Sequence, residues 1–226
     1  MASTVLLQGG AEFGPSCREM DSALLARVGT VPVVVVALAA EPGRDYASAS
    51  ARAVDYYSSL GAADVVAAPD ARTDPEGAVA AVRRAGLVVL PGGSPNRLLT
   101  GLRATAVGDA VRDVLAAGGA VSGASAGAMV LCAWTVLPEQ GRPELVEGLG
   151  VVPRSLALPH FSGDVRWLDA ISDRLPADVT VLGLAECAGV FAVGPDHAQV
   201  TAVGAAPTRL LGARDQELAI GSSLTI

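Results

Sequence analysis

The chain has 226 residues, enough for one sizeable α/β domain, so we expect a single domain over residues 1–226. Hydrophobic residues make up 51% and aromatic residues 4%, which predicts a core built from alanine, valine and leucine. The formal net charge is −7 and there is no run of basic residues, which argues against binding to a nucleic-acid backbone.

The cysteines and the N-terminus bear on the cellular setting. Cys17, Cys132 and Cys187 are widely spaced and match neither a disulfide framework nor a zinc site, which favours a reducing compartment. The N-terminus lacks the charged start of a signal peptide. The longest apolar run, Val31 to Ala40, is about half the length that spans a membrane. We therefore expect a cytoplasmic protein without a membrane segment.

Up to Ser125 the chain alternates between short apolar runs and helical patterns. The runs expected to form strands are Val5–Gln8, Val31–Leu38, Ala63–Ala67, Leu87–Leu90 and the run from Ala120 to Ser125. The expected helices are Cys17–Val28, Asp45–Leu60, Pro75–Ala85 and Ala106–Ala117, with one more after Ser125. Such alternation predicts a three-layer, doubly wound α/β fold, a mostly parallel sheet with helices on both faces.

After the helix that follows Ser125 the pattern loosens. Leu137 to Pro153 is rich in proline and glycine and predicts a long loop, with a short hairpin as an alternative. Leu156–Leu158 is expected to be a brief strand and Asp164–Leu175 a helix. Short strands with antiparallel or mixed pairing at the sheet edge are expected at Val179–Leu184, Val190–Val193, Gln199–Val203 and Thr208–Leu211.

The strand-to-helix junction at Ser125 contains the spacing Gly123-x-Ser125-x-Gly127, which is typical of a nucleophile elbow. A serine on such a sharp turn holds strained dihedral angles, and small flanking residues let the strand and the helix approach each other. The helix N-terminus also directs N–H groups and the positive end of its dipole toward the serine oxygen. An ordinary glycine-rich loop is the alternative to a nucleophile at Ser125.

Three glycine-bearing loops follow predicted strands, at Gly9-Gly10, Gly92-Gly93 and Gly123 to Gly127. In a parallel sheet the ligand site lies beyond the carboxyl ends of the strands, where these loops would meet. Attack on a carbonyl group creates an oxyanion that needs two positioned donors. We expect the Ala126 N–H to supply one donor and Gly92 or Gly93 the other.

A serine nucleophile needs a base, and the sequence offers two histidines. His160 follows an apolar strand, at the point where the chain leaves the sheet, and is the favoured base. The alternative is a structural histidine whose ring is hydrogen-bonded within the core, under a loop. His197 lies in a polar turn and is expected to be solvated.

The base in turn needs a carboxylate that orients it. Glu186 lies between two apolar strands, where a carboxylate is costly to bury unless it is hydrogen-bonded, and His160 is a suitable partner. An exposed turn carboxylate is the alternative for Glu186. Asp164 and Asp196 are its competitors for the orienting role.

From about Val5 to Val193 the chain resembles the serine peptidase family that contains dipeptidase E (aspartyl dipeptidase) and cyanophycinase. The resemblance rests on four segments, which are Leu90-Pro91-Gly92-Gly93, Gly123-Ala124-Ser125-Ala126-Gly127-Ala128, Leu158-Pro159-His160-Phe161 and Gly183-Leu184-Ala185-Glu186. It implies a fold similar to that of class I glutamine amidotransferases, which is flavodoxin-like. It also implies Ser125 as nucleophile, His160 as base and Glu186 as third member of the triad.

Two departures from the family touch substrate recognition. The family commonly has Asn-Thr after the paired glycines, and in dipeptidase E an asparagine in that region helps to hold the substrate's α-amine; this chain has Ser94-Pro95 and then Asn96. Cyanophycinase has an arginine-rich stretch after its histidine, where this chain has only Arg166. Ser94, Asn96 and Arg166 are the candidate substrate-binding residues, and hydrolysis is better supported than a preference for aspartyl dipeptides.

The function predicted from the sequence is therefore a serine peptidase that hydrolyses a small peptide or isopeptide bond without a metal or an organic cofactor. A catalytically silent binding module, a serine amidase or esterase, and a glutaminase are the alternatives, although a glutaminase normally uses a cysteine on the elbow. The expected partner is a small peptide, with neither nucleic acid nor membrane, and the oligomeric state is left open between a monomer and a homodimer.

Overall fold

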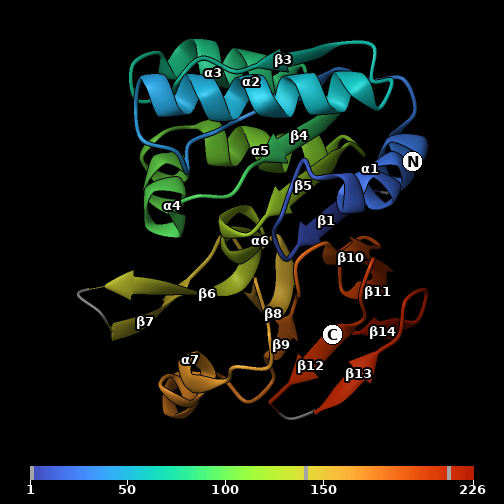
Figure 1. The fold of residues 1–226 in the computed structure, drawn as a ribbon. Coiled ribbons are helices and arrows are strands. Elements are labelled where there is room, and N and C mark those ends of the chain that lie inside the picture. Colours follow the sequence, from blue (N-terminus) through green and yellow to red (C-terminus); the bar gives the residue numbers. More distant parts are fainter. Residues whose placement is uncertain (1–2, 140–141, 213–214) are drawn as a thin grey trace.

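The computed structural model describes residues 3–139, 142–212 and 215–226, so Met1, Ala2 and residues 140–141 of the predicted loop lie outside it. The described strands form two sheets, one of eight strands and one of six, flanked by helices. The predicted mixed α/β fold is confirmed. The second sheet is an addition that the sequence patterns did not indicate (Figure 1).

The eight-stranded sheet holds the strands that precede Ser125. Its central strands are parallel, and three antiparallel strands from the end of the chain extend one edge. In spatial order the strands are β14 (Ser223–Thr225), β11 (Gln199–Gly204), β10 (Ala188–Val193), β1 (Thr4–Gln8), β5 (Ala120–Ala124), β4 (Leu87–Leu90), β2 (Val33–Val35) and β3 (Val65–Ala67).

The helices are α1 (Arg18–Val28), α2 (Arg44–Ser59), α3 (Pro75–Arg83), α4 (Pro95–Ala104), α5 (Val107–Ala116), α6 (Ala126–Leu131) and α7 (Arg166–Asp169), with single 3-10 turns at Pro15–Cys17 and Ser172–Arg174. No described helix is both long and apolar enough to cross a lipid bilayer.

Helices cover both faces of the parallel sheet, as its apolar strands predict. Neighbouring strand residues enter opposite cores: Val33 and Val35 pack with side chains of α1 and the second half of α2, whereas Val34 packs with α3, α4 and α5. The same alternation holds along β4 and β1. Because successive side chains of a strand point to opposite faces, a run that is apolar throughout requires a cover on each side.

The six-stranded sheet comes from the region where the sequence patterns were weakest. In spatial order its strands are β13 (Gln216–Leu218), β12 (Thr208–Leu211), β9 (Thr180–Gly183), β8 (Val152–Leu158), β6 (Cys132–Glu139) and β7 (Arg142–Glu147). The prediction of a long loop over Leu137 to Pro153 is wrong, and the hairpin alternative is correct: β6 and β7 pair in antiparallel fashion. Pro138 of β6 lies opposite Pro143 of β7. Because proline is rare inside strands, these two residues made the sequence resemble a loop.

Three other expectations change. The predicted Asp164–Leu175 helix is reduced to α7 and a 3-10 turn. Helix α4 was missed, since a proline-glycine cluster precedes it; Ser94 caps its N-terminus by accepting from the Arg97 N–H at 3.2 Å. Of the four short strands expected at the sheet edge, β10 and β11 lie there, while β9 and β12 belong to the second sheet.

The parallel strands around Ser125 end at the same level. Gln8 of β1 is paired with Ala124 of β5, and Leu90 of β4 with Gly123. In the second sheet β8 and β9 are also parallel, with Leu158 opposite Gly183. The loops after all five strands therefore carry the candidate site residues, in line with the rule that ligands bind beyond the carboxyl ends of parallel strands.

Candidate active site

Ser125 occupies a strained turn between β5 and α6. Its φ of 48° and ψ of −108° lie outside the regions that most residues adopt. A side-chain carbon on Gly123 would lie 2.5 Å from the Gly127 carbonyl carbon, and one on Gly127 would lie 2.2 Å from the Leu90 oxygen. Both glycines are therefore needed for the close approach of strand and helix, as the elbow pattern predicts.

His160 lies beside Ser125 although 35 residues separate them in the sequence. Ser125 Oγ is 3.0 Å from His160 Nε2, a hydrogen-bond distance. The His160 N–H donates to the Gly9 oxygen at 2.8 Å, which ties the loop after β8 to the loop after β1. A side-chain carbon on Gly10 would lie 2.3 Å from His160 Cε1, so the Gly10 backbone forms the wall behind the imidazole ring.

Glu186 lies on the other side of the imidazole. Its Oε1 is 3.4 Å from His160 Nδ1, longer than an optimal hydrogen bond. The Glu186 side chain is 65% exposed and that of His160 is 51% exposed, so the pair is open to solvent and Glu186 is not the buried carboxylate that its apolar neighbours suggested. Contacts between catalytic groups are often long in ligand-free enzymes and tighten when substrate excludes water.

The competing residues have other partners. Asp164 is bound by the guanidinium group of Arg166, whose hydrogen bonds lower the Asp164 pKa to about 2. Asp196 accepts from the Ala198 N–H. His197 is buried, with 8% of its surface exposed, and not solvated as expected. It contacts Ser3 Oγ at 2.9 Å and the Val151 oxygen at 3.2 Å, and burial lowers its pKa.

The predicted oxyanion donors differ in their availability. Ala126 is the first residue of α6, and the first N–H groups of a helix have no acceptor within the helix. The Gly92 N–H already donates to Glu12 Oε1 at 3.0 Å. Gly93 lines the same cleft as Ser125, and its N–H has no acceptor among the described residues. Gly93 is thus the free member of the pair.

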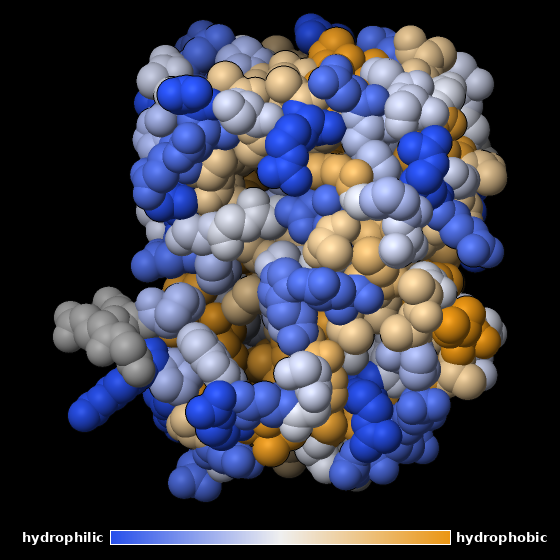
Figure 2. Space-filling view, in the orientation of Figure 1, coloured by the Kyte–Doolittle hydropathy of each residue, from blue (hydrophilic) through white to orange (hydrophobic). Residues whose placement is uncertain are grey.

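A cleft of about 460 Å³ opens in front of Ser125 and His160. Most of its wall is apolar and comes from α6, β6, β8 and the segment around α7, namely Met129, Val136, Pro138, Leu158, Phe161 and Trp167. Figure 2 shows a hollow with hydrophobic side chains in this part of the molecule. His160 is the only basic side chain among the residues that line the cleft.

The candidate substrate-binding residues are engaged elsewhere in this structure. The Ser94 hydroxyl caps α4, the Asn96 oxygen accepts from Thr100 at 3.3 Å, and the Arg166 guanidinium is bound to Asp164. None of the three lines the cleft, which is instead bordered by Pro95 and Asp164. Their role in substrate binding stays a prediction.

The cysteines are not placed as nucleophiles. Cys17 and Cys187 are buried with their Sγ atoms 2.8 Å apart, and burial together with this contact raises the Cys17 pKa. Burial raises the Cys132 pKa to about 12. Because the thiolate is the reactive form of cysteine, such thiols are poor nucleophiles.

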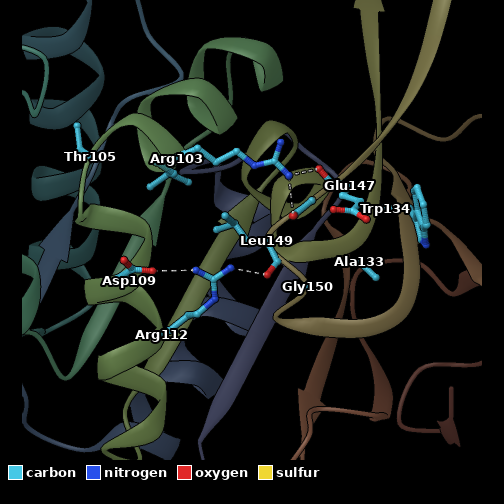
Figure 3. Close-up of a pocket in the computed structure, with 11 residues that line it drawn as sticks. Arg103, Thr105, Asp109, Arg112, Ala133, Trp134, Glu147, Leu149 and Gly150 are labelled. Atoms are coloured by element: carbon cyan, nitrogen blue, oxygen red, sulfur yellow. Dashed lines mark hydrogen bonds and ion pairs between the residues drawn. The ribbon is translucent and has the colours of Figure 1, made fainter.

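A larger cavity lies away from Ser125, between helices α4 and α5 and the loop after β7 (Figure 3). It measures about 560 Å³ and contains two arginines. Arg103 donates to the Glu147 and Gly148 oxygens, and Arg112 donates to the Leu149 oxygen and to Asp109 (Figure 3). These guanidinium groups are used to hold the loop, and none of the predicted site residues lies in this cavity.

Glu12 lies near the candidate site and was not singled out by the sequence analysis, although it is not among the residues that line the cleft. A side-chain carbon on Gly92 would lie 2.7 Å from Glu12 Oε1 and 3.2 Å from Ser125 Cβ, so the carboxylate is close to the nucleophile. Its position two residues after the Gly9-Gly10 pair, at the carboxyl end of β1, was the available signal. Among the described residues the structure has no group of three His, Cys, Asp or Glu side chains that could hold a metal ion.

Comparison with known proteins places the chain in a family. A peptidase from an acI-B1 actinobacterium has a similar structure, with a TM-score of 0.84 and 24% identity over 100% of this chain and 98% of its own. A protein from Listeria monocytogenes EGD-e, provisionally named peptidase E, has a TM-score of 0.64 and 14% identity over 91% of this chain and 100% of its own. None of the curated protein sequences matches. The model of peptidase family S51 matches residues 5–194, and the chain belongs to this family of serine peptidases, which includes dipeptidase E and cyanophycinase.

Proposed function

We propose that the protein hydrolyses small peptide bonds through a triad of Ser125, His160 and Glu186. The observation that carries this proposal is the 3.0 Å contact between Ser125 Oγ and His160 Nε2, made by a serine held in a strained elbow. The strain fixes the hydroxyl at the mouth of the cleft, where a substrate carbonyl can reach it.

In the first step His160 Nε2 accepts the Ser125 proton as the oxygen attacks the carbonyl carbon, forming a tetrahedral intermediate. His160 then donates that proton to the departing amine, which leaves an acyl-enzyme. Water, activated by the same imidazole, releases the acid and restores Ser125. Glu186, which faces Nδ1, keeps the proton on that nitrogen so that Nε2 is free to act as base.

We assign the stabilisation of the negative charge on the tetrahedral oxygen to the Ala126 and Gly93 N–H groups, which would donate hydrogen bonds to it. Ala126 adds the positive end of the α6 dipole, although that helix is short. Gly93 is preferred to Gly92 because the Gly92 N–H is bound to Glu12. Removal of one such donor typically costs a hundredfold to a thousandfold in rate, about 3–4 kcal/mol.

The cleft favours peptides with an apolar side chain over aspartyl dipeptides. An acidic side chain needs a cationic partner, but Arg166 is not among the residues that line the cleft and is already bound to Asp164, which is. Trp167, with 42% of its surface exposed, and Met129 instead offer an apolar surface next to the nucleophile. Burial of one apolar side chain there contributes roughly 1.5–3 kcal/mol to binding.

Covalent labelling with a fluorophosphonate tests the proposal directly. The wild-type protein is expected to gain one phosphonyl group on Ser125, located by mass spectrometry of a digest, whereas Ser125→Ala stays unlabelled. Ser122→Ala is the matched control, because Ser122 is a buried serine of β5 outside the cleft. Labelling that persists in Ser125→Ala, or no labelling of the folded wild type, would contradict the triad.

A further inference from the structure

We propose that Gln8 is a positioning residue of the active site. Its hydrogen bond to the buried carboxylate of Asp21 fixes the carboxyl end of β1, and that end holds the members of the triad in place relative to one another. The inference rests on the proposed function, because it concerns the same triad. It adds a residue that lies behind the nucleophile and acts through the backbone of β1 rather than by contact with substrate.

The first support is a row of main-chain contacts made by residues 8–10. The first carbonyl oxygen of this segment accepts from the Ser125 N–H at 2.9 Å, and the second accepts from the His160 N–H at 2.8 Å. The third accepts at 3.1 Å from the N–H of Cys187, the residue after Glu186. Three consecutive residues thus bind the backbone of the nucleophile, of the base and of the loop that carries the proposed carboxylate.

The second support is the close packing of this segment against the site. A side-chain carbon on Gly9 would lie 2.0 Å from the Ala185 oxygen, and one on Gly10 would lie 2.3 Å from His160 Cε1. The two glycines let the backbone of β1 lie directly against the imidazole and against the residue before Glu186. A shift of the segment is therefore passed on to both groups, because no flexible side chain lies between them.

The third support is the anchor of the segment. Gln8 carries its only side chain, since the next two residues are glycines. The Gln8 Nε2 donates to Asp21 Oδ1 of α1 at 2.6 Å and to Ser122 Oγ of β5 at 3.1 Å. Gln8 is 2% exposed and Asp21 is 1% exposed. The proposal concerns the shorter contact, because a hydrogen bond to a charged group is about twice as strong as one between neutral groups.

Asp21 is itself held by two tyrosines of α2. The Tyr56 hydroxyl donates to Asp21 Oδ2 at 2.8 Å, and the Tyr57 hydroxyl donates to Oδ1 at 3.2 Å. Burial raises the pKa of Asp21, and the hydrogen bonds from the two tyrosines and from Gln8 act in the opposite direction. The carboxylate thereby connects the end of β1 to both helices that cover this face of the sheet.

The make-up of this cluster favours precise positioning over stability. Gln8 Oε1 is buried and has no hydrogen-bond partner among the described residues, which costs stability. Leu6, on the same face of β1, packs into an apolar core, and an apolar residue at position 8 would avoid that cost. Apolar packing has no preferred direction, whereas a hydrogen bond restricts both distance and angle. The amide therefore fixes where β1 ends.

Gln8→Met is the first test, because it keeps an unbranched side chain and removes the hydrogen bond to Asp21. We expect the rate of Ser125 labelling by a fluorophosphonate to fall about 10- to 100-fold in a protein that urea titration shows to be folded, since a misplacement of 1 Å can cost a hundredfold. The control is Tyr46→Phe, which removes the hydrogen bond from another buried tyrosine of α2 to the Ala68 oxygen and should leave the rate unchanged. A wild-type rate in Gln8→Met, or an equal loss in Tyr46→Phe, would overturn the proposal.

A compensating pair separates loss of the contact from general damage to the core. Gln8→Asn shortens one side of the contact by a methylene group, and Asp21→Glu lengthens the other side by the same amount. Each change alone should slow labelling, and the double variant should recover most of the loss, because the two residues act as one unit. A double variant no faster than the slower single variant would contradict the proposal.

The two histidines provide a readout that needs no substrate. Their Cε1–H signals can be followed by proton NMR and assigned with His160→Ala. In Gln8→Met the His160 signal should shift, because this carbon faces the Gly10 backbone, whereas His197, which contacts Ser3 and Val151, should keep its signal. A His160 signal that does not move would show that Gln8 does not position the imidazole.

Failure of this inference is distinguishable from failure of the proposed function. If the fluorophosphonate labels the wild type and Gln8→Met at the same rate, the triad stands and the role of Gln8 is wrong. If the fluorophosphonate fails to label the folded wild type, the triad is wrong, and the inference about Gln8 falls with it.

Discussion

The cleft at Ser125 and the arginine-lined cavity between α4, α5 and the loop after β7 are opposites in their chemistry. The cavity is larger, about 560 Å³ against about 460 Å³, and it contains two guanidinium groups. Those groups already donate to loop carbonyls (Figure 3). The cleft contains fewer charges, but its serine is strained and its Gly93 N–H has no acceptor among the described residues.

The proposed function therefore places the active site in the smaller hollow, on the ground of its strained serine and its N–H group without an acceptor among the described residues. A guanidinium group that holds a loop contributes to stability, whereas a strained serine next to an exposed imidazole costs stability. Strain of this kind is typically of order 1–3 kcal/mol per residue and persists only where the surrounding structure enforces it. The following three changes test the contrast, from the largest expected effect to the smallest.

His160→Ala should give the largest effect. Without the imidazole the Ser125 proton has no acceptor, so kcat, or the labelling rate with a fluorophosphonate, should fall by about a thousandfold or more. The matched control is His197→Asn, which changes the other histidine, a buried residue that is not among those lining the cleft. Loss of labelling in His197→Asn with retention in His160→Ala would reverse the assignment of the base.

Glu186→Gln should give an intermediate effect. The amide can still contact His160 but no longer stabilises the charged imidazole, and the exposed pair is weakened by solvent. We expect a fall in labelling rate of about a hundredfold, measured at constant pH against the exposed Glu76→Gln as control. A fall no larger than that of the control would remove Glu186 from the triad.

Arg112→Ala should affect stability alone. The substitution removes a hydrogen bond to the Leu149 oxygen, which we expect to lower the free energy of unfolding by about 1 kcal/mol in urea titration. The rate of Ser125 labelling should be unchanged. Arg52→Ala, an exposed arginine of α2, is the control for loss of charge. A loss of labelling in Arg112→Ala would make the larger cavity part of the active site.

The sequence patterns were most informative where local geometry leaves few alternatives. The elbow at Ser125 could be predicted because its turn demands small residues on both sides, and the strands before it because apolar runs of that length need cover on both faces. Because parallel strands run in one direction, their order also predicted that the glycine loops meet at one edge of the sheet. His160, at the end of an apolar strand, and Glu186, between two apolar strands, were the candidate base and carboxylate on the same kind of local evidence, and the family resemblance implied both as well.

The second sheet and the pairing of site groups were decided by tertiary structure. The β6–β7 hairpin contains two prolines, so its pattern indicated a loop, and only packing against β8 gives it a place in a sheet. The proximity of Glu12 to Ser125 depends on the register of β1 against β5 and β4, which no local pattern encodes. Local sequence thus determined the strained serine, because steric limits act between neighbouring residues. The charges that surround it were decided by contacts between distant segments.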